Sequence, residues 1–207
     1  MTTDKKEVAD VAPLNEQQLE QIHDERREQI KKAALKVFAR HGINGTKMSM
    51  IAAEAGISQG LSYRYFSSKE ELFTELVQEA MEEAQHSMKE LGRMPGSPAE
   101  QIRVLTEAML EGDNKDAFLL IHQAQTSSDV PERAKEMIGR YSPEDTIEQL
   151  VPILVKGQEA GEFREGDPRR LLFLYLSALT GLMLQEVPGQ PDYWRNESGL
   201  LMGILLR

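Results

Sequence analysis

Apolar residues recur every three or four positions along most of the chain, which is the spacing of amphipathic α-helices. The first apolar stripe consists of Leu19, Ile22, Ile30, Ala33, Ala34, Val37 and Phe38. Asn15 and Gln18 before it have the spacing of a capping box, and His41-Gly42 after it is typical of a helix C-terminus. A long first helix is therefore predicted over residues 15–41. Residues 1–14 are polar and are predicted to form a flexible arm.

Two shorter apolar patterns follow this helix. Residues 48–55 and 59–66 predict two short helices, joined by the turn Gly56-Ile57-Ser58. Ser68 and Glu71 again have capping-box spacing and predict a fourth helix from Lys69 to about residue 91. Two short helices joined by a glycine-containing turn have the anatomy of a helix-turn-helix, whose second helix enters the DNA major groove. Residues 15–68 are therefore predicted to be a three-helix DNA-binding domain.

The remainder of the chain also has helical periodicity. The stretch GRMPGSP, residues 92–98, ends the long fourth helix. Later helices are predicted from signals that start or bend a helix: Ser97-Pro98, Asp113 or Asn114, Pro131, Ser142-Pro143, Pro152 and Asp167-Pro168. A final helix is predicted over residues 192–206, and no strand is expected. The fold class is therefore all-α, with about nine to ten helices and a second domain over residues 69–207.

Charge is distributed unevenly along the chain. The formal net charge is −10, yet residues 26–69 contain nine basic and two acidic residues, so the remainder carries −17. An acidic protein with one basic region suggests that this region meets a polyanion. The chain has no cysteine, and its first twenty residues contain no apolar segment of secretory type. The apolar run of residues 171–184 is shorter than the roughly 20 residues that span a bilayer. A cytoplasmic protein without a membrane partner is expected.

Side chains suited to phosphate contact gather in residues 58–69. Gly60 has no Cβ to keep a phosphate away, and Ser58 can cap the third helix. Tyr63 and Tyr65 can donate hydrogen bonds from their hydroxyl groups. Lys69 lies in the first turn of the fourth helix, where a cation opposes the helix dipole, so a phosphate contact explains it better. The alternative is that the two tyrosines are half-buried and the lysine is solvated.

An ordered set of residues in this region closely resembles the DNA-binding signature of the TetR family of transcriptional regulators. The matching positions are Thr46, Ile51, Ala52, Ala55, Gly56, Ile57, Ser58, Gly60, Tyr63, Tyr65, Phe66, Ser68, Lys69, Glu70, Leu72 and Phe73. The stretch AALKVFARHGINGT before them resembles the end of the family's first helix and the turn after it. This resemblance covers residues 26–76, and a weaker one covers residues 161–184.

The resemblance implies a role for individual residues. Ser58, Gln59 and Gly60 match the turn and the start of the recognition helix, while Tyr63, Tyr65 and Lys69 match positions near phosphates. Phe66 matches a core aromatic, and Arg64 can face the groove. The predicted DNA-binding set is Lys47, Ser49, Ser58, Gln59, Gly60, Tyr63, Arg64, Tyr65 and Lys69.

Two positions depart from the family pattern. Lys47 stands where the family often has a serine or threonine that caps the second helix, so Thr46 is expected to cap and Lys47 to bind a phosphate. Ser62 stands where a larger apolar residue is common, which either weakens local packing or frees a hydroxyl group.

The second domain is expected to form a dimer and to bind a small molecule. Residues 171–184 are apolar around most of the helix and need burial on several sides, so a homodimer is predicted through about residues 168–187 and 192–206. A largely apolar effector pocket is predicted among the fifth to eighth helices. Its candidate residues are Met109, Phe118, His122, Met137, Tyr141, Tyr175 and Met183. Each of them can instead be a core residue.

The predicted function is ligand-responsive, sequence-specific regulation of transcription. Binding of a palindromic double-stranded DNA operator as a dimer, with release by a small apolar effector, describes a repressor. An activator, or a regulator without an effector, is the alternative. A metal enzyme is a weaker alternative. Glu20 with His23 and Glu83 with His86 have the Glu-x-x-His spacing of di-iron helix bundles, but both pairs lie in polar stretches. No enzyme activity, metal or cofactor is predicted.

Overall fold

The computed structural model describes residues 15–140, 143–185 and 198–207. The described residues contain no strand, and their helices follow the prediction of an all-α fold. Phe163 and Leu206 form an isolated antiparallel bridge. The helices are α1 (Glu16–Gly45), α2 (Met48–Glu54), α3 (Gln59–Tyr65), α4 (Lys69–Leu91), α5 (Pro98–Leu110), α6 (Gly112–Thr126), α7 (Glu132–Ile138), α8 (Pro143–Glu159), α9 (Pro168–Met183) and α11 (Ser198–Met202).

Several predicted helix caps are present. Asn15 and Gln18 form the capping box of α1, and the Ser58 hydroxyl accepts a hydrogen bond from the backbone N–H of Leu61. The Ser68 hydroxyl accepts from the backbone N–H of Glu71, and the Asp167 carboxylate accepts from two backbone N–H groups at the start of α9. These contacts satisfy N–H groups that lack a partner within the helix.

Two predicted caps are wrong. α6 begins at Gly112 after Glu111, so neither Asp113 nor Asn114 caps it. Asn114 instead donates from Nδ2 to the carbonyl oxygen of Ala108 and so ties α6 to the end of α5. Lys47, and not Thr46, precedes α2, and its side chain makes no capping hydrogen bond.

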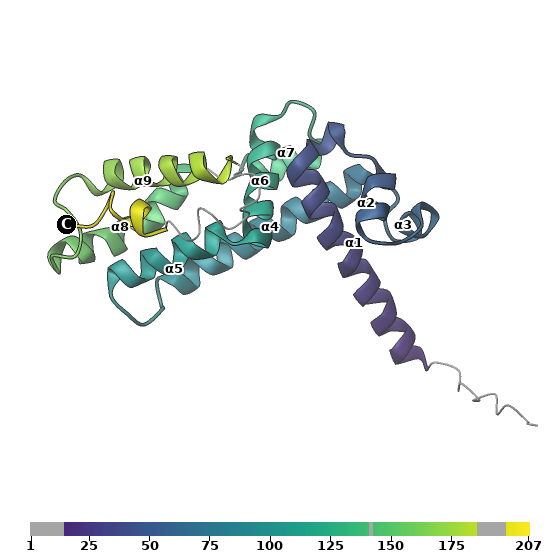
Figure 1. The fold of residues 1–207 in the computed structure, drawn as a ribbon, viewed down its shortest axis with the longest axis horizontal. Helices are drawn as coiled ribbons and strands as arrows, with labels where there is room; N and C mark the ends of the chain where they lie inside the picture. The colour runs from purple at the N-terminus through teal and green to yellow at the C-terminus, as the bar shows by residue number, and fades with distance from the viewer. Residues whose placement is uncertain (1–14, 141–142, 186–197) are drawn as a thin grey trace, which may run out of the picture.

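The helices bury two apolar cores, which lie at different places along an elongated molecule (Figure 1). The first core joins α1–α4 with Leu120 and Ala124 of α6 and with Ala134 and Ile138 of α7. The second joins α5, α8, α9 and α11. α4 contributes to both, with Phe73 in the first and Leu91 in the second. α4 therefore links the α1–α3 end of the molecule to the opposite end.

Some predicted segments lie outside the described residues: the arm of residues 1–14, Tyr141, and residues 186–187 and 192–197 of the predicted dimer surface. The final predicted helix is represented by α11 and the turns that follow it.

Candidate DNA-binding surface

α2 and α3 are held at a fixed angle by the turn between them. Gly56 has φ +65°, a left-handed conformation that favours glycine. The backbone N–H of Ile57 donates to the Ala52 carbonyl at 2.9 Å. Gln29 of α1 donates from Nε2 to the Ala55 carbonyl at 2.6 Å. Because Ala52 and Ala55 are both buried, α2 packs closely against its neighbours and sets where α3 begins.

Most predicted DNA-contacting residues lie on the outer side of these two helices. The exposed members of the set are Lys47, Ser49, Ser58, Gln59, Gly60, Tyr63 and Arg64. A Cβ at Gly60 would have no atom within 4 Å, and its φ is not in the left-handed region. Neither packing nor backbone conformation therefore requires a glycine there, and the space beside it is open.

Ser62, the residue that departs from the family pattern, is fully buried under this surface. Its hydroxyl donates to the Gln59 carbonyl at 2.8 Å, so the side chain makes an internal hydrogen bond and is not available to DNA. Phe66 is also fully buried, as predicted, and the Arg27 guanidinium lies 4.6 Å from the centroid of its ring. The inner side of α3 is therefore core.

Tyr65 lies between the core and the exposed surface. It packs against the first core, and its ring centroid lies 4.7 Å from that of His23. In the sequence, His23 stood out only through its Glu-x-x-His spacing with Glu20. Among the residues that the structure describes, no group of three or more metal-ligating side chains occurs. The contact places the exposed N-terminal part of α1 beside the end of α3.

Lys69 has internal hydrogen-bond partners. Its Nζ donates to the carbonyl oxygens of Ile43 at 2.7 Å and of Thr46 at 3.0 Å. The ammonium group therefore holds the end of α1 to the start of α4. One of its three N–H donors remains for a phosphate, so the predicted phosphate contact stays a prediction.

The basic region of residues 26–69 does not face one direction. Arg27 pairs with Glu75 at 2.7 Å and Lys31 with Glu79 at 2.7 Å, both on α4. Lys32 pairs with Asp113 of α6 at 2.9 Å. Although burial disfavours its charge, hydrogen bonds to Glu28 and Glu79 raise the pKa of Lys31. Arg27, Lys31 and Lys32 therefore form ion pairs with acidic residues of α4 and α6. The prediction that the whole basic region meets a polyanion is too broad.

Comparison with known proteins agrees with this geometry. Residues 30–76, which run from α1 into α4, match the family described as "Bacterial regulatory proteins, tetR family". The matched segment is a TetR-family DNA-binding segment. It contains the helix-turn-helix formed by α2 and α3, and the protein is a DNA-binding transcriptional regulator.

Similar proteins cover most of this chain. The fatty acid metabolism regulator protein of Bacillus subtilis is 28% identical over 147 residues, which are 69% of this chain and 73% of that protein. The transcriptional repressor KstR2 of Mycolicibacterium smegmatis is 26% identical over 170 residues, 80% of this chain and 82% of the repressor. The solved structure of the ketosteroid regulator KstR2 of Mycobacterium tuberculosis has a TM-score of 0.65 and 22% identity, covering 88% of this chain and 95% of that one.

The predicted effector residues divide between the two cores. Tyr175 and Met183 are buried in the second core, and Met109 and Phe118 pack against it. The ring of His122 stacks near that of Phe118, with centroids 6.2 Å apart. Met137 packs against the first core instead.

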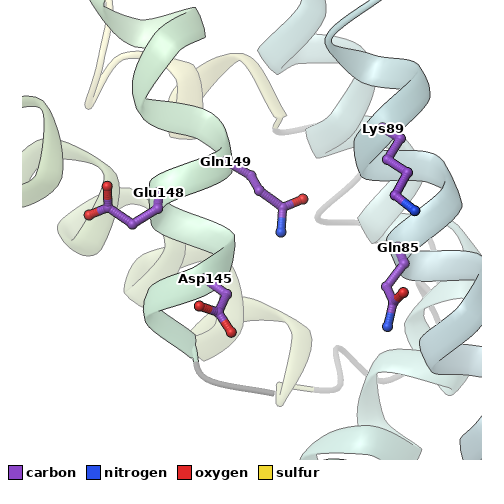
Figure 2. Close-up of a pocket in the computed structure, with 5 residues that line it drawn as sticks. All are labelled: Gln85, Lys89, Asp145, Glu148 and Gln149. Carbon is purple, nitrogen blue, oxygen red and sulfur yellow. The ribbon is translucent and has the colours of Figure 1, made fainter. Parts of the chain in front are cut away.

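The described surface includes two grooves that none of the predicted effector residues lines. A groove of about 600 Å³ separates α4 from α8 and is lined by polar side chains, which Figure 2 shows around one open space: Gln85, Lys89, Asp145, Glu148 and Gln149. A groove of about 440 Å³ lies between the start of α4 and α7, and its lining includes Glu70, Thr74 and Arg133. No described helix has the length and apolar character needed to cross a bilayer.

Proposed function

We propose that this protein represses transcription by binding a palindromic operator as a homodimer and is released by a small, largely apolar effector. The observation that carries the DNA-binding part is the outer face of α2 and α3. Polar and basic side chains cover that face around Gly60, whose missing Cβ leaves open space. Gln59 and Arg64 are proposed to read bases, while Ser58, Tyr63 and Lys47 contact phosphates. Such a role places the protein in the cytoplasm.

The dimer is supported by apolar side chains that the chain leaves uncovered. Phe173 and Leu174 of α9 are 60% and 58% exposed, and Leu200 of α11 is 75% exposed. Leu184, just past the end of α9, is 47% exposed. These residues lie within the predicted interface of residues 168–187 and 192–206. A second copy related by a two-fold axis would cover them and would present two recognition helices to two half-sites.

The apolar effector is supported by the composition of the second core and by the names of relatives. Tyr175 and Met183 of α9 are buried in the second core, and Met109 of α5 and Phe118 of α6 pack against it. One relative is named for fatty acid metabolism, and one solved structure is that of a ketosteroid regulator. An effector that binds better to a state with wrongly spaced recognition helices would release the operator.

Selection of bound sequences from random double-stranded DNA tests the proposal. The full-length protein should enrich a palindrome with half-sites about one helical turn apart or a multiple of it. Gln59→Ala or Arg64→Ala should change the enriched bases, whereas Tyr63→Phe should weaken binding to all sequences alike. Glu54→Gln, an exposed change on α2, is the control. Enrichment of no sequence at low salt would refute the proposal.

The dimer is tested separately. Phe173→Glu with Leu174→Glu should convert the protein to a monomer in analytical ultracentrifugation and reduce operator binding. A monomeric wild-type protein that still binds a palindrome tightly would contradict the proposed interface.

A further inference from the structure

α1 is interrupted shortly before the helix-turn-helix. Gly42 has φ 65° and ψ 174°, which breaks the regular hydrogen-bonding pattern of the helix. Four carbonyl oxygens around this break accept hydrogen bonds from side chains. The Gly42 carbonyl accepts from the Thr46 hydroxyl at 2.7 Å, while Lys69 of α4 donates to Ile43 and Thr46. The fourth, of Ala39, accepts from Nε2 of Gln123 at 2.8 Å.

Gln123 comes from α6, which belongs to the predicted effector domain. Its side chain is partly buried, and a Cβ added at Gly42 would lie 3.7 Å from its Oε1 atom. Gln123 therefore reaches the interrupted turn itself, three residues past Ala39. Leu120 and Ala124 on the same helix are buried in the first core beside it.

Two exposed contacts flank the partly buried hydrogen bond between Gln123 and Ala39. Lys32 pairs with Asp113 near the start of α6, and Asn44 donates to Asp129 just beyond its end at 2.7 Å. Contacts with α1 therefore occur near the start of α6, within it and just beyond its end. Exposed contacts of this kind contribute little and are screened by salt, whereas a hydrogen bond that is partly buried, like that of Gln123, is directional and more costly to leave unmade.

We infer that Gln123 positions the helix-turn-helix relative to the effector domain, by holding the carbonyl of Ala39 at the break in α1. This rests on the proposed function. α2 begins at Met48, only a few residues after the break, so any tilt of the end of α1 is passed to α2 and α3. Lys69 of α4 donates hydrogen bonds to the same turn. Side chains from α4 and α6, the two helices that connect to the effector domain, therefore both hold the turn at Gly42. Movement of α6 then changes the placement of the recognition helix without any change in the residues that contact DNA.

The test compares the wild-type protein with Gln123→Met, which keeps side-chain length and removes the amide. Operator affinity should fall about 5–20-fold, because binding must then order a looser helix-turn-helix. The salt dependence of binding and the sequence preference should stay unchanged, since no phosphate or base contact is lost. Gln125→Met, an exposed change on the same helix, is the matched control and should have no effect.

Hydrogen exchange in the DNA-free protein provides a second readout. Amides of residues 43–48 should exchange faster in Gln123→Met than in the wild type or the control, while those of α9 should not change. If Gln123→Met does not fold, Gln123→Asn, which is too short to reach Ala39, replaces it. Unchanged affinity together with unchanged exchange at residues 43–48 would overturn the inference. Faster exchange in a protein that never binds a specific operator would refute the proposed function and leave the positioning role standing.

Discussion

Arg27 donates two parallel hydrogen bonds to the carboxylate of Glu75, from Nη1 to Oε1 at 2.8 Å and from Nη2 to Oε2 at 2.7 Å. The same guanidinium lies over the ring of Phe66. One side chain of α1 therefore fixes both the end of α3 and the first part of α4. Burial raises the pKa of Glu75 above its usual range, and the attraction of Arg27 opposes that rise.

Arg27→Met should destabilise the protein most at neutral pH. Without Arg27 the pKa of Glu75 rises further. When the pKa of a carboxyl group is raised in the folded state, the protein loses stability as the pH rises from the unfolded-state pKa through the folded-state pKa of that group. We expect a loss of about 1 kcal/mol at pH 7, since the pair is partly screened by solvent, and a smaller loss near pH 4.5. Chemical unfolding at both pH values measures it.

The double variant Arg27→Met with Glu75→Gln is the control for that experiment. It removes the uncompensated carboxylate, so it should recover part of the stability at pH 7 and show little difference between the two pH values. Equal losses in the single and double variants would mean that Arg27 acts through its stacking on Phe66 and not through Glu75.

Asp116→Asn should stabilise the protein at neutral pH. Burial raises the pKa of Asp116, although the neighbouring charges of Arg40 and Lys36 oppose the rise. The raised pKa means that the stability falls as the pH rises above about 4, the usual value for an aspartate. The variant's melting temperature should exceed that of the wild type by about 1–2 °C at pH 7 and match it at pH 3.5. A lower melting temperature for Asp116→Asn would show that its attraction to Arg40 outweighs its burial.

Short-range features of this fold could be predicted from sequence because both partners lie within one turn. The Asn15–Gln18 capping box and the Ser68 and Asp167 caps are examples of this kind. The positions of Phe66 in the core and of Gln59 and Gly60 on the surface followed from the resemblance to a family. In each case the local pattern and the fold agree.

Features that depend on partners far along the chain could not be predicted. Lys31 meets Glu79 and Gln123 meets Ala39 across 48 and 84 residues. The charge count over residues 26–69 therefore included, as candidates for binding a polyanion, basic residues that pair with α4 and α6. Thr46 looked like a cap for α2, but its hydroxyl faces the break at Gly42 and is buried there. His-Gly at positions 41–42 did signal a break, without showing what would hold the freed carbonyl groups.

Thr106→Val should cost more stability than Tyr175→Phe, although both remove one hydroxyl from the second core. Thr106 donates to the Ile102 carbonyl at 2.6 Å and is hydrogen-bonded to the Tyr175 hydroxyl, whose pKa burial raises to about 12. In Tyr175→Phe the threonine keeps its bond to Ile102, so the loss should be about 1 kcal/mol or less. In Thr106→Val the tyrosine retains only the sulfur of Met202, at 3.9 Å, and the loss should be about 2 kcal/mol.

Urea unfolding at one fixed protein concentration measures both losses, because the stability of the proposed dimer would depend on concentration. The opposite order would mean that Tyr175 does not donate to Thr106. A far-ultraviolet spectrum of each folded variant controls for a general loss of helix.

Lys69→Met should reduce both the stability of the protein and the salt dependence of its DNA binding. The stability falls because the carbonyl groups of Ile43 and Thr46 lose their donor. The salt dependence falls because each phosphate contact contributes about 0.9 to the slope of log affinity against log salt, so the proposed dimer should lose about 2. Lys47→Ala serves as the comparison, since this exposed side chain makes no capping hydrogen bond and should change the slope without changing the melting temperature. A lower melting temperature with an unchanged slope would show that Lys69 only closes the break in α1, and that the phosphate contact expected from its position in the family pattern does not form.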